Sequence, residues 1–211
     1  MVPGYYSKLI LVFSLFIVGC YKKGSVDEAI KSVEQASLIK EYDNPSLFVG
    51  EAYCYYVYQS VLDPVKIPPQ KFGEFVKGGT LSLEFITGYN QWISSKKGEL
   101  CKLVVGQDFK PIDLDENKKY VIFLNKSAIH NDGQDIKITQ NHEKLHVAFS
   151  LFKNKRDRIR KIWSSMPIKE KNEFKESHPG YNFSNEEVVL REFFAYKFQG
   201  QLNKGIQFLI D

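Results

Sequence analysis

Two histidines and a glutamate that could bind and use a metal ion stand within five consecutive residues, His142-Glu143-Lys144-Leu145-His146. On an α-helix the four-residue spacing places both imidazoles on one face, about one turn apart. Two ring nitrogens can then bind a single zinc ion, and Glu143 can reach a water activated by that ion. The H-E-x-x-H pattern therefore predicts a zinc-dependent hydrolase site with His142 and His146 as ligands and Glu143 as general base.

The residues around the motif predict the helix that it requires. Apolar side chains recur at helical spacing and would bury one side of the segment; they are Leu145, Ala148, Phe149 and Phe152. We expect Thr139 to be the N-cap and the helix to end near Lys153. The chain has four histidines, and a chance match is on the order of one in a few hundred. The alternative is an ordinary amphipathic helix with two surface histidines.

A later helix carries a candidate for the third ligand. We expect a final helix from Ser184, with Glu187 completing a capping box, to Gln199. Its apolar residues surround most of its circumference, so Glu192 must lie among them, where an unpaired carboxylate is costly. Glu186 and Glu187 have simpler roles in the first turn, where the helix dipole stabilises acidic side chains. Glu192 is therefore the predicted third ligand.

These two helices, roughly from Thr139 to Gln199, resemble those of the zincin metallopeptidases, whose active-site helix carries H-E-x-x-H. In the gluzincin branch a later helix supplies a glutamate ligand in the form E-x-x-A or E-x-x-x-D, and Glu192-Phe193-Phe194-Ala195 matches the first form. Tyr196 stands where the second form has aspartate, so the usual hydrogen-bond partner of the first histidine must come from elsewhere or be missing. No further histidine follows at the metzincin spacing.

The resemblance implies a zincin-like α+β fold, Zn²⁺ as cofactor and a protein or peptide substrate. A tetrahedral intermediate also needs a hydrogen-bond donor for its oxyanion. His178, Tyr181 and Tyr196 are the candidates for this role and for substrate binding. Each of the three is also explained as an ordinary loop or core residue.

The first residues read as an export signal. Lys8 precedes an uncharged apolar run, Leu9 to Val18, that is too short to span a bilayer. Ile17-Val18-Gly19-Cys20 looks like the lipobox of bacterial lipoproteins, which implies cleavage before Cys20 and a lipid on its thiol. A plain secretory signal or a buried hydrophobic segment are the alternatives.

We therefore expect a signal peptide over residues 1–19, a tether over 20–25 and a single catalytic domain over 26–211. The domain would be anchored in the bacterial cell envelope, on the periplasmic or outer-membrane face. Removing residues 1–19 lowers the formal net charge from +4 to +3 because only Lys8 is lost. So small a balance predicts no nucleic-acid partner.

Two cysteines remain after Cys20. An even number in an exported domain favours a Cys54–Cys101 disulfide. Two free buried thiols are the alternative, because cysteine is among the most buried residue types.

Upstream of the metal helix, composition predicts a helix over 26–42 and then four strands. The expected strands are Leu47 to Leu62, Thr80 to Ile86, Leu100 to Val105 and Lys119 to Leu124. The last is so continuously apolar that we place it at the centre of a small mixed or antiparallel sheet. The strand beginning at Thr80 could pair with an extended substrate, and Gly78-Gly79 before it is expected to break the chain.

A basic run, residues 153–161, follows the metal helix. It is either a patch for anionic lipid or cell-wall polymer, or the solvated face of a helix. We favour the helix face, because Ile159, Ile162 and Trp163 supply an apolar stripe.

Together these patterns predict a zinc metallopeptidase that hydrolyses peptide bonds in the bacterial cell envelope. A catalytically silent envelope-binding lipoprotein on a zincin-like scaffold is the alternative from another class. The presence of Glu143 argues against it, because a scaffold needs no general base. A cell-wall peptide amidase would share the zinc chemistry and differ only in substrate.

Overall fold

The computed structural model describes residues 25–59, 61, 67–112, 115, 117–153, 156–179, 181 and 183–211. The predicted signal peptide, Cys20 and almost all of the predicted tether lie outside these residues. No helix in the described ranges is long and apolar enough to cross a membrane.

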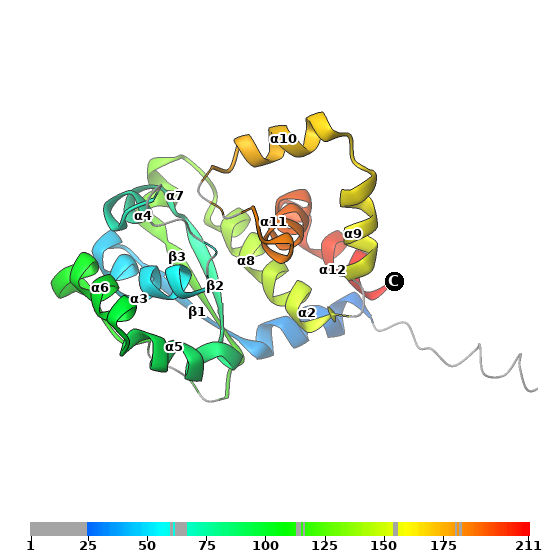
Figure 1. The fold of residues 1–211 in the computed structure, drawn as a ribbon. Helices are drawn as coiled ribbons and strands as arrows, with labels where there is room; N and C mark the ends of the chain where they lie inside the picture. The colour runs from blue at the N-terminus through cyan, green and yellow to red at the C-terminus, as the bar shows by residue number, and fades with distance from the viewer. Residues whose placement is uncertain are drawn as a thin grey trace, which may run out of the picture.

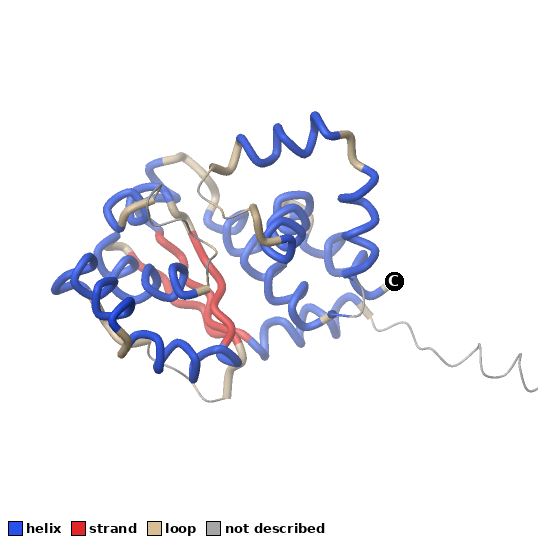
Figure 2. Tube along the Cα trace, in the orientation of Figure 1, coloured by secondary structure: helices blue, strands red, loops and turns tan. Residues whose placement is uncertain are grey.

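A three-stranded sheet lies between two groups of helices (Figures 1 and 2). Its strands are β1 (Ser37–Tyr42), β2 (Gly78–Ser82) and β3 (Tyr120–Asn125). The order is β1-β3-β2, with β3 parallel to β1 and antiparallel to β2. The expected small mixed sheet in an α+β fold is confirmed, and so is the central place of the apolar strand.

Strand β3 is apolar from Val121 to Leu124 because both faces of the sheet are covered. Val121 and Phe123 belong to one core, and Tyr120, Ile122 and Leu124 belong to another on the opposite face. All six residues of the strand are buried. The alternation of side chains along one strand thus divides the described structure into two halves.

One half, here called the aromatic half, covers the first face of the sheet. Its helices are α3 (Pro45–Tyr58), α4 (Pro69–Phe75), α5 (Ile86–Ile93) and α6 (Lys96–Val105), with 3₁₀ turns at Leu83–Phe85 and Gly106–Asp108. Rings fill much of its core; Phe48 stacks on Phe72 with centroids 5.0 Å apart. Cys54 on α3 and Cys101 on α6 form a disulfide, with Cα atoms 5.9 Å apart.

The other half, here called the histidine half, covers the second face. Helix α8 (Ile136–Leu151) packs against β2 and β3, and α11 (Glu186–Phe198), α12 (Leu202–Ile210) and α2 (Val26–Ala36) pack around it. A short helix, α7 (Lys126–Asn131), joins β3 to α8. Helices α9 (Arg156–Ser165) and α10 (Ile168–Glu176) lie on the outside of this half (Figure 1).

The prediction of a strand over Leu47 to Leu62 is wrong, because α3 occupies most of this segment. Asn44 caps the helix and Pro45 begins it. Every residue from Phe48 to Tyr56 is buried, so the segment has no polar face and no amphipathic period. Valine and tyrosine then suggest a strand by composition alone.

The strand predicted from Leu100 to Val105 is also wrong, since these residues belong to α6. Ser95 caps that helix by accepting a hydrogen bond from the Gly98 amide, and Gly106, with φ 73°, ends it. Its buried residues, Gly98, Cys101 and Val105, follow one another at steps of three and four positions, as helical packing requires.

Three predicted boundaries also need correction. The helix expected over 26–42 ends at Ala36, because the chain turns extended at Ser37 and pairs with β3 as β1. The strand expected over 80–86 is Gly78–Ser82, and the chain then coils into the 3₁₀ turn and α5. The glycines expected to break the chain therefore lie inside β2.

The caps of the two site helices also differ from those predicted. Asp135, not Thr139, caps α8 by accepting a hydrogen bond from the Lys137 amide. Asn185, not Ser184, caps α11. Nor is α11 the final helix, because α12 follows it after Gly200.

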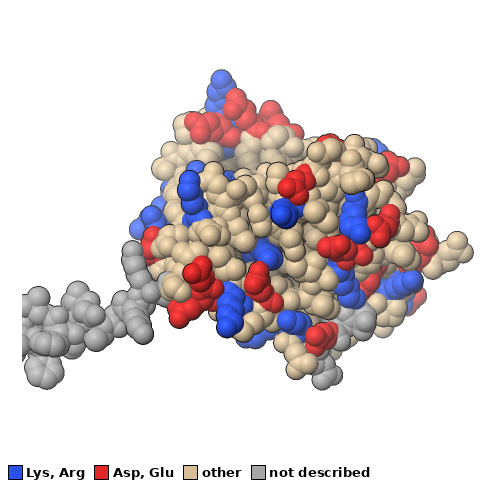
Figure 3. Space-filling view, turned by 180° about the vertical axis from the view of Figure 1, so that it is seen from behind, with Lys and Arg blue, Asp and Glu red and all other residues tan. Residues whose placement is uncertain are grey.

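The basic run after α8 lies partly on α9 and agrees with the helix-face interpretation. Ile159 is buried in the histidine half, while Arg156 pairs with Glu187 and Arg160 pairs with Glu186 of α11. Basic and acidic side chains are interspersed over the face drawn in Figure 3 as well.

Candidate metal centre

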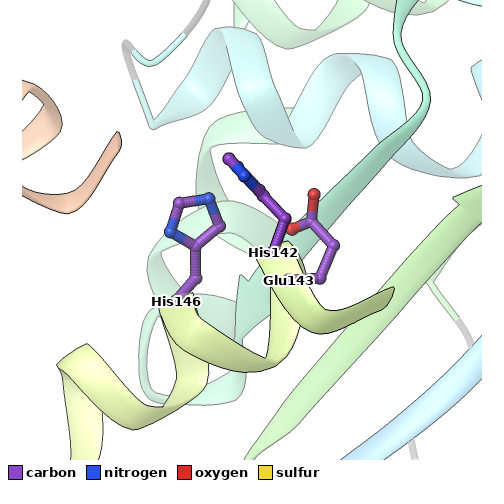
Figure 4. A group of neighbouring side chains, drawn as sticks. All are labelled: His142, Glu143 and His146. Carbon is purple, nitrogen blue, oxygen red and sulfur yellow. The ribbon is translucent and has the colours of Figure 1, made fainter. Parts of the chain in front are cut away.

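Helix α8 presents the three motif residues on one side. His142, Glu143 and His146 are all buried, and one ligand atom from each lies within 4.8 Å of the others. Figure 4 shows the three side chains rising from the same side of the helix. The buried position excludes the alternative of two surface histidines.

Helix α11 crosses α8 and brings Glu192, which is 1% exposed, to the same place. Its Oε2 lies 3.5 Å from Nε2 of His142 and 3.4 Å from Nε2 of His146. These separations exceed an ordinary hydrogen bond. They match the distance of about 3.3–3.5 Å between two ligand atoms that each lie about 2.0–2.2 Å from a tetrahedral zinc.

A polar atom left without a partner points to the same ligand set. Oε2 of Glu192 is buried and has no hydrogen-bond partner among the described residues. Nδ1 of His146 also has none there, but this nitrogen faces away from an ion bound at Nε2. Buried polar atoms are rarely left unsatisfied unless a water or ion is involved. Two imidazoles and one carboxylate with an open position are the donor set of a catalytic zinc site, so these residues fit a metal ion.

Charges in the centre are strongly coupled. Burial alone would raise the pKa of Glu192, but attraction to His146, contact with His142 and the charge of Arg191 hold this pKa well below its usual value. Burial likewise acts to lower the pKa of His142, yet contact with Glu192 and the charge of Glu143 outweigh it and the pKa is raised. For His146 burial prevails and the pKa is lowered. The two imidazoles and the carboxylate therefore interact strongly enough to move one another's pKa values.

A glutamine supplies the partner that the sequence pattern left unassigned. Oε1 of Gln199 lies 3.1 Å from Nδ1 of His142, so the ring donates there and turns Nε2 toward Glu192. The gluzincin pattern places an acid at the position of Tyr196, whereas Gln199 is three residues further along. Nothing in the sequence signals this role, because it depends on where α11 ends relative to α8.

A threonine on the edge strand holds the predicted base. Oγ1 of Thr80 lies 2.8 Å from Oε2 of Glu143 and 3.1 Å from its backbone oxygen. The sequence predicts a strand that begins at Thr80, but nothing in it indicates that this hydroxyl contacts the base. This hydrogen bond orients the carboxylate of Glu143, which is the predicted base and not a metal ligand.

The two glycines of β2 explain how the strand approaches so closely. A Cβ on Gly78 would lie 2.9 Å from Cγ2 of Thr139 and 3.0 Å from Oε1 of Glu143. A Cβ on Gly79 would overlap the hydroxyl of Tyr56. Glycine inside a strand is typical where another element comes close to the backbone.

The centre opens into two hollows. The larger hollow, with a volume of about 530 Å³, is lined by both histidines, the base and Glu192, and by aromatic residues that include Phe72 and Phe75. The smaller hollow, of about 250 Å³, lies on the side of His146, Lys153 and Arg191. Residues of β2 line both.

The three candidates for oxyanion or substrate binding all line the larger hollow. The ring of Tyr196 lies 4.5 Å from that of His142 and 4.0 Å from that of His178. Burial raises the pKa of both Tyr181 and Tyr196, so their hydroxyls stay protonated and can donate. Nδ1 of His178 lies 2.7 Å from the Phe174 carbonyl oxygen, which orients that ring.

The remaining predicted residues lie outside the centre. Glu186 and Glu187 lie in the first turn of α11, as expected, and pair with arginines of α9. The capping box expected between Ser184 and Glu187 is wrong, because Asn185 caps the helix and accepts from the Glu187 amide. The disulfide of Cys54 and Cys101 joins α3 to α6 in the aromatic half.

A buried His-Glu-His group on one helix, faced by a buried glutamate on another, is compatible with a zincin motif and can hold a metal ion. No family model, curated protein or solved structure matches the chain.

Proposed function

We propose that this protein is a zinc-dependent metallopeptidase of the gluzincin type, with His142, His146 and Glu192 as ligands. The observation that carries the proposal is the position of Glu192 Oε2, at 3.5 and 3.4 Å from the two Nε2 atoms and without a hydrogen bond in the described structure. A bound zinc ion would supply Lewis acidity, polarising the scissile carbonyl and activating a water.

The chain's own residues provide the proton transfers. Glu143, held by Thr80, takes the proton of the attacking water and delivers it to the leaving amine. The hydroxyls of Tyr181 and Tyr196 are protonated donors at the wall of the larger hollow and suit the developing oxyanion.

A peptide is the substrate class that best suits the cleft. Strand β2 is at an edge of the sheet, and its residues line both hollows. An exposed strand edge can hydrogen-bond an extended peptide backbone. The aromatic wall that includes Phe72 and Phe75 suits an apolar side chain.

The location of the enzyme is proposed from the sequence alone. We infer that Cys20 carries the lipid of a bacterial lipoprotein and anchors the catalytic domain in the cell envelope. Mass spectrometry of the mature N-terminus tests this, and an unmodified chain that starts elsewhere would refute the anchor.

The function is tested by metal analysis of the purified protein combined with casein and peptide-library digests. The wild type should contain one zinc and cleave peptides. Glu143→Gln should retain the zinc and lose activity by at least about 100-fold, because proton transfer goes while the ligands stay. Glu186→Gln is the matched control, since this acid lies on the surface and pairs with Arg160. A variant Glu143→Gln with near wild-type turnover would refute the assigned mechanism.

A further inference from the structure

An arginine next to the third ligand has a charge that the centre does not fully compensate. Arg191 precedes Glu192 on α11 and lines both hollows. Its Nη2 lies 3.3 Å from Oε1 of Glu192, while its Nε is buried without a hydrogen-bond partner in the described part of the chain. A guanidinium group has five N–H donors in a planar fork, and Glu192 accepts from only one side of this group.

Glu192 is itself shared. Its Oε2 faces the two histidines, so only one of its oxygens serves Arg191. A partly buried cation with so incomplete a partner is costly. An anion arriving beside it would be bound with charge-assisted hydrogen bonds.

The smaller hollow around Arg191 has a positive excess. Its wall carries three cations, Lys153, Arg156 and Arg191, and two acids, Glu84 and Glu187. Arg156 and Glu187 pair with each other. Lys153, Arg191 and Glu84 remain, so the wall carries one more cation than acids. Outside this wall, Arg191 keeps its single contact with Oε1 of Glu192.

We propose that the smaller hollow binds a carboxylate of the peptide substrate through Arg191, with Lys153 at its rim. This inference rests on the proposed peptidase function and specifies its substrate class. The carboxylate belongs either to an acidic side chain close to the scissile bond or to the free C-terminus, and both present the same planar group to the arginine fork.

The experiment begins with a peptide that the zinc-loaded wild-type protein cleaves in a library digest. Four versions are made, with glutamate or glutamine near the scissile bond and with a free or amidated C-terminus. Dissociation constants are then measured with the zinc-loaded Glu143→Gln protein, which binds without turnover. Removal of the carboxylate that Arg191 binds should weaken binding by about 10-fold or more. Weaker binding of the glutamine version points to a side-chain carboxylate, and weaker binding of the amidated version points to the C-terminus.

The same series is repeated after adding Arg191→Gln, Lys153→Gln or Lys169→Gln. Arg191→Gln should abolish the difference between the acidic and neutral versions while zinc content stays unchanged. Lys153→Gln, at the exposed rim, should reduce the difference by about twofold to threefold. Lys169→Gln is the control, because Lys169 lies on α10 with a side chain 85% exposed.

The outcomes separate this inference from the function on which it rests. A wild-type protein that cleaves peptides with no carboxylate preference, or a preference unchanged by Arg191→Gln, overturns the inference and leaves the peptidase assignment standing. A second result also overturns the inference: Arg191→Gln loses zinc, and Lys153→Gln keeps the wild-type preference for the acidic peptides. This result would show that Arg191 only supports Glu192. A zinc-loaded wild type that cleaves no peptide refutes the proposed function itself.

Discussion

Besides Glu143, each half of the described structure buries one glutamate, and these two acids are compensated in different ways. Glu51, in the aromatic half, is 9% exposed and meets the ammonium of Lys40 and the hydroxyl of Tyr42. Glu192, in the histidine half, is 1% exposed, and one of its oxygens has no hydrogen bond among the described residues. Both are buried acids, but only Glu51 has a complete set of protein partners at its two oxygens.

These different partners suggest different roles: Glu51 supports the fold, whereas Glu192 is suited to bind a metal ion. A buried carboxylate with its own cation needs nothing further. A buried carboxylate aimed at two neighbouring imidazoles gains its missing partner when a metal ion binds. The comparison predicts that changes in the histidine half affect metal binding and that changes in the aromatic half affect stability.

The largest effect is expected for Glu192→Gln. Structural zinc sites with four protein ligands are worth roughly 10–16 kcal/mol, or about 2.5–4 kcal/mol per ligand. The loss of one protein ligand should therefore weaken zinc binding by about 70- to 900-fold. Competition with a chromophoric chelator measures it. Glu187→Gln, on the same helix but paired with Arg156, is the control and should keep wild-type affinity. Zinc bound equally well by Glu192→Gln would contradict the ligand assignment.

Removing the disulfide with Cys54→Ala and Cys101→Ala together should lower the free energy of unfolding by about 2–4 kcal/mol. The bridge joins residues 47 positions apart and constrains the unfolded chain. Urea unfolding of the double variant measures the loss, and zinc affinity in the same sample should be unchanged. A large fall in zinc affinity would show that the two halves are not energetically separate.

Gln199→Ala removes the partner of His142 Nδ1 without touching a ligand. Outer partners of metal-bound histidines typically contribute 10- to 100-fold in affinity, so a loss of about that size is expected in the chelator assay. Gln199→Glu should restore or exceed wild-type affinity, because a carboxylate also accepts from Nδ1. Alanine without effect would mean that the 3.1 Å contact does not orient the ring.

The smallest effect is expected for Glu51→Gln. Lys40 and Tyr42 donate to different oxygens of Glu51. The amide oxygen of glutamine can still accept from Lys40, while its NH2 group must donate to a Tyr42 hydroxyl that has turned to accept. The charge assistance and this rearrangement should cost about 1 kcal/mol in unfolding free energy. Zinc affinity should not change. A zinc defect in this variant would erase the distinction between the two acids.

The two halves also differ in how far their structure follows from sequence. In the histidine half, the spacing of His142 and His146 and the apolar surroundings of Glu192 predicted two helices and their facing residues. In the aromatic half, the strands predicted over α3 and α6 are wrong, for two different reasons. Helix α3 is buried on nearly all sides, so its sequence has no polar face and lacks the period that distinguishes helix from strand. Helix α6 is largely exposed, but its outward positions Leu100, Leu103 and Val104 are apolar and hide the same period.

By itself the sequence determined what local spacing and composition can express: the metal-binding pattern of α8, the isolation of Glu192 and the apolar central strand β3. Only the tertiary structure showed the partners that reach these residues from other elements: Gln199 at His142, Thr80 at Glu143 and Arg191 at the smaller hollow. Spacing along one helix is set by its 3.6-residue turn and can be read from a single segment. Contact between segments depends on how α11 crosses α8 and how closely the glycines of β2 let that strand approach, and no local pattern records either.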